Sequence, residues 1–328
     1  MEKIKTLLRK IDSITGVRID DVFGRTIYPY AKYLRYSHFH SKPRFVKIET
    51  TNFCNSKCLY CPHKDLRRKK GFMKESLFRK IINECVSWKI KEIHLCNFGE
   101  PLVDRKITER IGYVKKKGNF IKTIIFTNGG LLTKEMSKKL MKAGLDEMWI
   151  SFDGFSKEHY EKYRYPLKYD LVVKNIENVV EIKKKLKTRT KIILQPVYDK
   201  NTVTYNQLKE FERRWNGIVG KIHIQKIHDW HGYIFKNDYK RRKVICRDIF
   251  QYMTINWDGS VVPCCLDYEG EHVLGDTNKN TIKEIWFGEQ FMDFRSKLLN
   301  DVSSFSMCSK CRMMSYNFEY PYLSSIFW

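Results

Sequence analysis

Short β-rich runs alternate with charged amphipathic stretches between about residue 45 and residue 227, and this alternation limits the possible folds more than any other feature of the chain. It predicts β/α units with parallel strands, because a parallel strand must be reached through a crossover that is usually a helix. Six units can be counted, too few for a closed eight-stranded barrel, so a partial (β/α)6 barrel is expected. The expected strands are 44–49, 92–96, 123–126, 148–152, 191–197 and 221–227, and the expected helices are 74–87, 106–117, 134–143, 170–185 and 206–215.

The pattern changes after residue 243. Two β-rich runs, 252–256 and 261–265, flank Gly259 in a hairpin signal, and an amphipathic stretch predicts a helix over 282–299. A small α+β domain is therefore expected after the barrel. The predicted divisions are an N-terminal helical arm over 1–43, the barrel over 44–240, the small domain over 241–316 and an aromatic tail over 317–328.

Charge and cysteine usage indicate the setting. The 328 residues include 62 Lys and Arg against 37 Asp and Glu, a formal net charge of +25. Charged residues interrupt every apolar run before it reaches the roughly 18 residues of a membrane helix, so no membrane span, no signal peptide and a cytoplasmic location are expected. In that compartment the ten cysteines favour metal ligands or catalytic thiols over disulfides.

Three of these cysteines, Cys54, Cys58 and Cys61, form a C-x3-C-x2-C run directly after the first expected strand. Barrel enzymes carry their chemistry on such loops. Three thiolates so close in the chain must share one metal centre. One alternative is a zinc site with His63 as the fourth ligand, because three cysteines and one histidine are an accepted zinc set.

The cysteine run resembles the signature of the radical S-adenosylmethionine (radical SAM) enzymes, including the aromatic residue, Tyr60, before the third cysteine. The resemblance implies that the three cysteines bind three irons of a [4Fe-4S] cluster and that S-adenosylmethionine chelates the fourth. An iron without a protein ligand leaves the open position that a catalytic metal requires. In this family an electron from the cluster cleaves the cosubstrate, and a 5′-deoxyadenosyl radical then abstracts hydrogen from the substrate. A low-potential electron donor such as flavodoxin or ferredoxin is an implied partner.

Further stretches agree with the resemblance in the family's order. Residues 97–101 (Asn-Phe-Gly-Glu-Pro) are similar to the family's Gly-Gly-Glu-Pro, with Phe98 in place of the first glycine. Residues 127–129 (Thr-Asn-Gly) resemble a ribose-contacting turn, and residues 151–154 (Ser-Phe-Asp-Gly) resemble the family's Ser-x-Asp-Gly. The resemblance implies that Glu100 accepts hydrogen bonds from the cosubstrate's ammonium and that Arg164 meets its carboxylate. The implied cosubstrate-binding residues are Tyr60, Gly99, Glu100, Asn128, Ser151, Asp153 and Arg164.

A second group of cysteines follows the barrel. With Gly259, Gly275 and residues 282–286 (Ile-Lys-Glu-Ile-Trp), it resembles the SPASM/twitch auxiliary domain of radical SAM enzymes over about 244–312. The full SPASM form carries more cysteines for two auxiliary clusters, so the one-cluster twitch form fits better. The resemblance implies a second [4Fe-4S] cluster with the ligands Cys246, Cys264, Cys308 and Cys311. Adjacent strand residues point to opposite faces, so Cys265 is expected to be a ligand only as a replacement for Cys264.

A cluster with four cysteine ligands has no free iron for substrate and is suited to accepting an electron. This favours dehydrogenation of a sugar- or cyclitol-like alcohol, as in the family's single-cluster aminocyclitol dehydrogenases. A redox-neutral epimerase, a peptide- or RNA-modifying radical SAM enzyme and, outside enzymes, a basic zinc-containing nucleic-acid-binding protein are the alternatives.

Polar side chains on the last two expected strands point to a substrate site. His223 and Gln225 alternate with isoleucines and are expected to face the barrel lumen, and His228 follows in the next loop. A histidine could act as the base that a dehydrogenation needs. The dispersed lysine runs favour solvated helix faces, with an anionic small-molecule substrate as the other explanation, and no sequence motif supports nucleic-acid binding.

Overall fold

The structure is a computed structural model that describes residues 41–227, 230, 233–234, 246 and 248–311. The chain divides into two compact units, Met1–Lys42 and Pro43–Trp328, and almost all described residues belong to the second. The predicted N-terminal arm, His228 and the aromatic tail lie outside the described residues, except for positions 41–43 of the arm.

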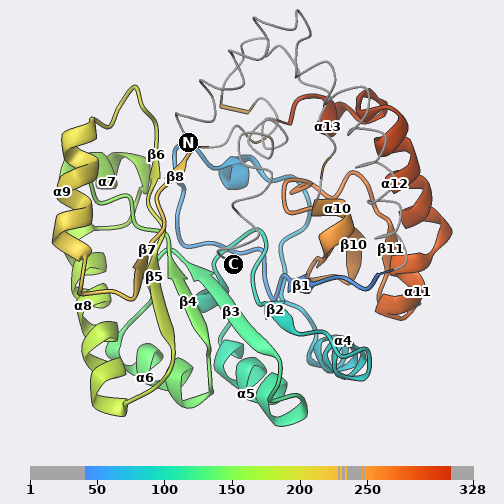
Figure 1. Cartoon of the computed structure of the whole chain (residues 1–328), viewed down its shortest axis with the longest axis horizontal. Helices are drawn as coiled ribbons and strands as arrows, with labels where there is room; N and C mark the ends of the chain where they lie inside the picture. Colours follow the sequence, from blue (N-terminus) through green and yellow to red (C-terminus); the bar gives the residue numbers. More distant parts are fainter. Residues whose placement is uncertain (1–40, 228–229, 231–232, 235–245, 247, 312–328) are drawn as a thin grey trace, which may run out of the picture. The chain divides into compact units, whose positions relative to one another are not determined.

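The predicted parallel strands form one side of a nine-stranded sheet with the order β11-β10-β9-β1-β2-β3-β4-β5-β7 (Figure 1). Every pairing from β1 to β7 in that order is parallel. This confirms the partial α/β barrel. The strands are β1 (Phe45–Ile48), β2 (Glu92–His94), β3 (Lys122–Thr127), β4 (Glu147–Ile150), β5 (Lys191–Leu194) and β7 (Lys221–Ile222).

Five predicted helices connect these strands, and Figure 1 shows them along the outside of the sheet. Strand residues that face the helices, such as Val46, Ile93, Ile125 and Ile150, are fully buried. Each contributes roughly 1.5–3 kcal/mol relative to exposure, so this layer is the main core. The helices are α4 (Glu75–Ser87), α5 (Ile107–Lys117), α6 (Lys134–Lys142), α8 (Tyr169–Leu186) and α9 (Tyr205–Trp215).

The last two barrel strands are shorter than the sequence pattern predicts. Two-residue strands β6 (Val197–Tyr198) and β8 (Gln225–Lys226) pair with each other in a separate sheet. Pro196 explains the division, because it has no N–H to continue the ladder that ends at Leu194 and Gln195.

The predicted hairpin after the barrel is present as β9 (Tyr252–Ile255) and β10 (Ser260–Val262), preceded by α10 (Asp248–Gln251). β9 pairs in parallel with β1, and β10 pairs with β11 (Gly275–Asp276). The hairpin therefore extends the barrel sheet beyond β1. The proposed domain boundaries themselves stay a prediction.

The stretch predicted as one helix over 282–299 is two helices, α11 (Ile282–Phe287) and α12 (Glu289–Asn300). Gly288 has an extended ψ of 159° and separates them. The buried Arg295 of α12 lies 3.9 Å from the ring centre of Trp286 and so packs the two helices together. The chain continues with two short turns, η5 (Val302–Ser304) and α13 (Ser306–Ser309).

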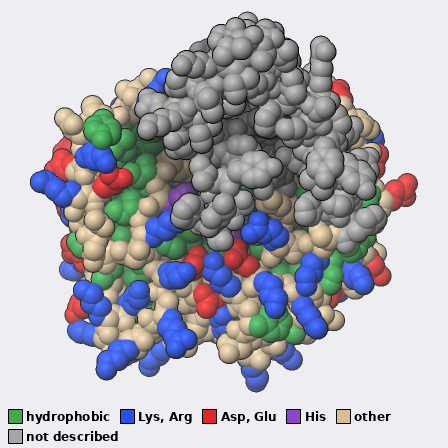
Figure 2. Space-filling view, in the orientation of Figure 1, with side chains coloured by type: hydrophobic (Ala, Val, Ile, Leu, Met, Phe, Trp, Pro, Cys, Tyr) green, Lys and Arg blue, Asp and Glu red, His purple; other side chains and the backbone are tan. Residues whose placement is uncertain are grey.

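No helix in the described part of the chain is long and apolar enough to cross a membrane. Figure 2 shows that Lys and Arg side chains are spread over the face of the molecule in view and are mixed with Asp and Glu. This distribution agrees with solvated helix faces as the main use of the basic residues.

Candidate metal centre and active site

The cysteine loop after β1 is fixed by backbone contacts with the end of α7 (Lys157–Tyr163), a helix that the sequence pattern did not predict. The Leu59 N–H donates to Tyr163 O at 2.9 Å, and the Lys57 N–H donates to Tyr165 O at 2.6 Å. The Ser56 hydroxyl adds a bond to Tyr165 O at 3.2 Å. The loop is thus held in one conformation by a segment about 100 residues later in the chain.

The three thiols of this loop lie in one electrostatic environment. Burial, followed by Glu100 and the neighbouring thiols, raises the pKa of Cys54 to about 12. Burial and then Cys58 raise the pKa of Cys61 to about 12. Without metal Cys54 and Cys61 are neutral thiols, and a positively charged metal centre would replace their protons. The donor set therefore fits an iron–sulfur cluster.

His63, the fourth ligand of the zinc alternative, is occupied by other contacts. Its Nε2 lies 2.7 Å from the Asn52 carbonyl oxygen, and its ring packs against Phe98 at 5.5 Å. Among the described residues, no three Cys, His, Asp or Glu side chains converge as the ligands of one ion would. The cysteines of a [4Fe-4S] cluster each bind a different iron, so they need not meet at one point.

Glu100 lies beside this loop and is 1% exposed. Its carboxylate accepts hydrogen bonds from Thr127 Oγ1 at 2.7 Å, Asn128 N at 2.7 Å and Leu102 N at 3.1 Å. Burial raises the pKa of Glu100 to about 7, although these hydrogen bonds act in the opposite direction. A buried carboxylate near the cysteines suits a ligand ammonium group. Glu100 is also the N-terminal cap of the short 3-10 turn η4 (Pro101–Val103).

Gly99 allows the Glu100 segment to approach the cysteine loop. Its φ is +148°, and a Cβ there would lie 2.9 Å from the Asn52 Cα and from the Phe53 carbonyl oxygen. The Glu100 N–H donates to this same Phe53 oxygen at 2.8 Å. Any larger residue would separate the two segments.

Asp153 and Arg164, predicted as separate cosubstrate contacts, bind each other. Arg164 donates from Nε to Asp153 Oδ2 at 2.6 Å and from Nη2 to Oδ1 at 3.0 Å, and both side chains are buried. The Tyr60 hydroxyl donates to the same carboxylate, and the Val197 N–H does so at 2.7 Å. This pair therefore fixes the cysteine loop through Tyr60. A direct contact of either residue with the cosubstrate stays a prediction.

Asn128 and Ser151 follow β3 and β4 at the same edge of the sheet. Asn128 Nδ2 donates to Asn55 Oδ1 at 2.8 Å and lies 3.9 Å from Cys54 Sγ. The half-buried Ser151 donates its backbone N–H to Thr127 O at 2.8 Å. Both side chains remain candidates for the cosubstrate.

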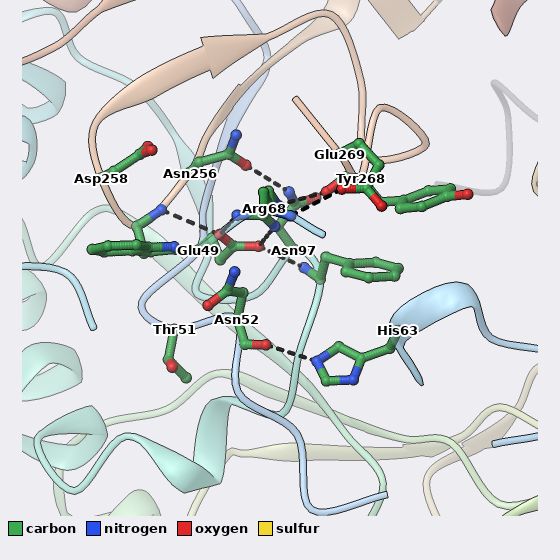
Figure 3. Close-up of polar contacts among 12 residues, drawn as sticks. Glu49, Thr51, Asn52, His63, Arg68, Asn97, Asn256, Asp258, Tyr268 and Glu269 are labelled. Carbon is green, nitrogen blue, oxygen red and sulfur yellow. Dashed lines mark hydrogen bonds and ion pairs between the residues drawn. The ribbon is translucent and has the colours of Figure 1, made fainter. Parts of the chain in front are cut away.

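An ion pair that the sequence analysis missed connects this region with the residues after β10 (Figure 3). Arg68 lies after the short turn η3 (Pro62–Asp65), and its guanidinium bonds both oxygens of the fully buried Glu49, at 2.8 and 2.5 Å. Its Nε donates to Tyr268 O at 2.5 Å, and its backbone N–H donates to Glu269. Glu49 also accepts the Phe98 and Trp257 N–H groups at 3.2 Å each. Arg68 stands in a basic run that resembles a solvated surface, so its spacing carried no signal.

The four cysteines predicted as ligands of the second cluster influence one another. Burial raises the pKa of Cys246 well above 9, with Cys311 and Cys308 among the further causes. Burial likewise raises the pKa of Cys264, with Cys265, Cys246 and Cys311 as the next causes. Cys308 and Cys311 are joined by a backbone hydrogen bond of 3.2 Å. We call these four thiols the second donor set, and their ligation of one cluster stays a prediction.

Cys265 influences Cys264 and also has neighbours outside the second donor set. Its sulfur is 3.9 Å from the Tyr252 hydroxyl and interacts with the ammonium of Lys47 on β1. Burial alone would lower the pKa of Lys47, but Cys265 and Cys96 outweigh it and raise the pKa.

Of the predicted substrate residues that the structure describes, His223 contacts the inner face of the barrel sheet, the face opposite the helices, and Gln225 lies on β8 of the separate two-stranded sheet. The His223 ring meets Trp149 edge-on at 5.5 Å, and burial lowers the pKa of His223. Gln195 Nε2 donates to Gln225 Oε1 at 2.8 Å, so these two amides satisfy each other in part.

A cavity of about 310 Å³ lies next to the second cysteine set. The Tyr233 hydroxyl in its wall donates to Asp65 at 2.5 Å, which places the cavity beside the first cysteine loop as well. Its walls include Arg67, Trp230, Tyr233, Tyr268, Met307 and Lys310.

Comparisons with known proteins agree with this geometry. Residues 48–203 match the model of the Radical SAM superfamily, and residues 246–312 match that of SPASM, an iron-sulfur cluster-binding domain. The tungsten-containing aldehyde ferredoxin oxidoreductase cofactor-modifying protein of Pyrococcus furiosus is 26% identical over 315 residues, 85% of each chain. The S-adenosyl-L-methionine-dependent 2-deoxy-scyllo-inosamine dehydrogenase of Niallia circulans is 21% identical over 282 residues, 84% of this chain and 96% of that one.

Among solved structures, BtrN in complex with AdoMet and 2-DOIA has the same fold, with a TM-score of 0.58 at 17% identity over 83% of this chain and 94% of that one. The partial barrel, its cysteine loop and the second cysteine set thus define an iron–sulfur enzyme that uses S-adenosylmethionine. The chain belongs to the radical SAM superfamily and carries a SPASM-type domain.

Proposed function

We propose that this enzyme dehydrogenates a sugar- or cyclitol-like alcohol and that a second [4Fe-4S] cluster accepts the substrate electron. The observation that carries the proposal is the second donor set, Cys246, Cys264, Cys308 and Cys311. Four cysteine ligands leave no open iron for substrate, so such a cluster is suited to electron transfer. The 2-deoxy-scyllo-inosamine dehydrogenase, which resembles this chain over most of its length, supports the same reaction class.

When bound, the two clusters and S-adenosylmethionine would supply the 5′-deoxyadenosyl radical that removes one hydrogen atom and the acceptor for one electron. Glu100 binds the cosubstrate ammonium in this scheme, because its carboxylate is buried beside the cysteine loop. The Asp153–Arg164 pair holds the loop in position through Tyr60. Both contributions are binding and positioning.

The alcohol must also lose its hydroxyl proton, and His223 is the proposed acceptor. Its lowered pKa keeps the imidazole neutral at pH 7, so it can take up a proton. Gln225 would orient the substrate, and His228 would contribute from the adjoining loop. Loss of one hydrogen atom, one proton and one electron from the alcohol gives the carbonyl product.

Reduction of the first cluster requires one electron per turnover, for which we propose flavodoxin or ferredoxin as donor. The exposed Lys57 and Leu59 on either side of Cys58 bring the surface close to that cluster.

A second candidate is the modification of a larger cofactor. The relative from Pyrococcus furiosus has the higher identity, 26%, and its name describes a cofactor-modifying protein. Such a substrate would need more room than a single ring, and the 310 Å³ cavity beside both cysteine sets could extend the site.

Product mass decides between these reactions. Anaerobically reconstituted enzyme is incubated with free and phosphorylated cyclitols and sugars, and 5′-deoxyadenosine and product are followed together. A product two hydrogens lighter supports dehydrogenation. A product of unchanged mass that carries solvent deuterium at carbon would contradict dehydrogenation and indicate epimerisation.

Replacement of Cys308 with Ala tests the proposed electron acceptor. Cosubstrate cleavage should continue while oxidised product falls by at least about tenfold, because hydrogen abstraction precedes the blocked electron transfer. Cys85→Ala, at a fully buried cysteine on α4, is the matched control and should leave the ratio of the two products unchanged. Equal loss of both products in Cys308→Ala would contradict an electron-accepting role.

A further inference from the structure

Three polar side chains form a row across the inner face of three neighbouring strands. Lys47 of β1 stands opposite His94 of β2 and opposite Thr254 of β9 in the strand register. Ring contacts show that Phe45, His94 and Tyr252 share one face of the sheet, because the Phe45 ring stacks on the His94 ring at 4.4 Å and on the Tyr252 ring at 4.8 Å. Residues two apart share a face, so Lys47 and Thr254 belong to this face as well.

Two members of the row have hydrogen-bonding atoms without a partner. Thr254 is 0% exposed and its Oγ1 is unpaired, and His94 is 8% exposed and its Nδ1 is unpaired. The other ring nitrogen of His94 bonds Glu92 at 2.6 Å. An unsatisfied buried polar atom costs about 1–3 kcal/mol, so two of them, one on each side of Lys47, indicate a missing partner.

The centre of the row is a cation that forms no ion pair with the described residues. The Lys47 ammonium lies 4.6 Å from the Tyr252 ring centre, bonds the Cys265 thiol and is near Cys96. The Asp248 carboxylate influences it, but that group already accepts the Tyr252 hydroxyl at 3.0 Å. Partly buried lysines are normally paired with an anion.

The position of Lys47 relates it to both metal centres. Cys265, which it bonds, is adjacent to Cys264 of the second donor set. Cys96, its other sulfur neighbour, interacts with Glu100, which in turn influences Cys54 of the first set. A ligand on Lys47 would therefore lie near Cys265, the chain neighbour of Cys264, and near Cys96.

We propose that Thr254, Lys47 and His94 anchor a substrate that carries an anionic group, a phosphate or a carboxylate. The inference rests on the proposed function in that it names a substrate class for the same active site. Lys47 supplies the charge and the Thr254 hydroxyl donates a hydrogen bond to the anion. The free His94 Nδ1 is an acceptor, because Nε2 donates the ring hydrogen to Glu92, and it would accept a hydrogen bond from a hydroxyl of the substrate. The substrate carbon to be oxidised would be held at a fixed distance from this anchor.

Anion binding without turnover tests the anchor separately from the reaction. Inorganic phosphate and acetate are titrated calorimetrically into reconstituted enzyme, and the stronger of the two identifies the anion class. We expect Lys47→Met to weaken binding at least about tenfold and Lys47→Arg to retain it. Thr254→Val, a change of nearly equal volume, should weaken binding severalfold.

Lys116→Met, at an exposed lysine on α5, is the control for loss of one positive charge and should bind as the wild type does. Iron content and circular dichroism report whether each variant is folded. If Lys47→Met fails to fold, Thr254→Val decides. Absence of binding in the wild type, or equal binding in Lys47→Met, would overturn the anchor, whereas an unoxidised product would overturn the proposed reaction and leave the anchor unaffected.

Discussion

Glu100 shows how one residue combines a predictable identity with an unpredictable environment. Its position in a Gly-Glu-Pro run identified it from the sequence, but the burial that raises its pKa, and the hydrogen bonds from Thr127 and Asn128 that partly oppose this rise, depend on the folded chain. The same holds for Arg68. It could not be distinguished from its neighbour Arg67 in the sequence, yet the side chain of Arg68 is 13% exposed and that of Arg67 is 77% exposed.

The pKa of Glu100 predicts a pH dependence of cosubstrate affinity. A pKa of about 7 leaves the carboxyl largely protonated below pH 7, and only the charged form attracts an ammonium. Affinity for S-adenosylmethionine should therefore fall towards tenfold per pH unit from pH 7 to pH 5.5, as measured by equilibrium binding to reconstituted enzyme.

Glu100→Gln provides the comparison. This variant should bind more weakly at pH 8 and lose the dependence between pH 5.5 and pH 7, because it has no proton to gain there. The same slope in the variant and in the wild type would assign the titration to another group.

At the scale of elements, periodicity predicted the barrel helices closely, because their apolar residues face one buried sheet. Periodicity missed α7, because seven residues are too few for a clear helical period. The C-terminal end of α7 and the residues after it nevertheless hold the cysteine loop. Periodicity also merged α11 with α12, since the apolar pattern continues across Gly288. Short elements and their contacts depend on tertiary structure more than on local sequence.

The Glu49–Arg68 pair should stabilise the connection between the cysteine-loop segment and the β9–β10 hairpin. Arg68→Met leaves a fully buried carboxylate without its cation, so we expect a loss of about 3–5 kcal/mol in the free energy of unfolding. Denaturant unfolding of the metal-free chain measures it.

Arg67→Met is the matched control, because the Arg67 side chain is 77% exposed and its ion pairs with Glu269 and Glu271 should be worth less than about 1 kcal/mol. The double variant Glu49→Gln/Arg68→Met should recover part of the loss. Equal effects of the two arginine substitutions would show that the buried pair has no special role.

At the scale of the whole molecule, the sequence predicted the partial barrel and the family, and both cysteine ligand sets stay predictions. It did not predict that β9 joins the barrel sheet beside β1, because strand pairing between distant segments leaves no local pattern. That pairing places Thr254 next to Lys47 and brings the two cysteine sets into one unit.

Iron and acid-labile sulfide analysis of reconstituted enzyme tests the two-cluster arrangement most directly. The wild type should contain about eight irons and eight sulfides per chain, and Cys264→Ser should contain about four of each. Cys265→Ser, the adjacent cysteine on the Lys47 side, should keep about eight. Stoichiometric zinc without sulfide, or loss of iron in Cys265→Ser but not in Cys264→Ser, would contradict the account.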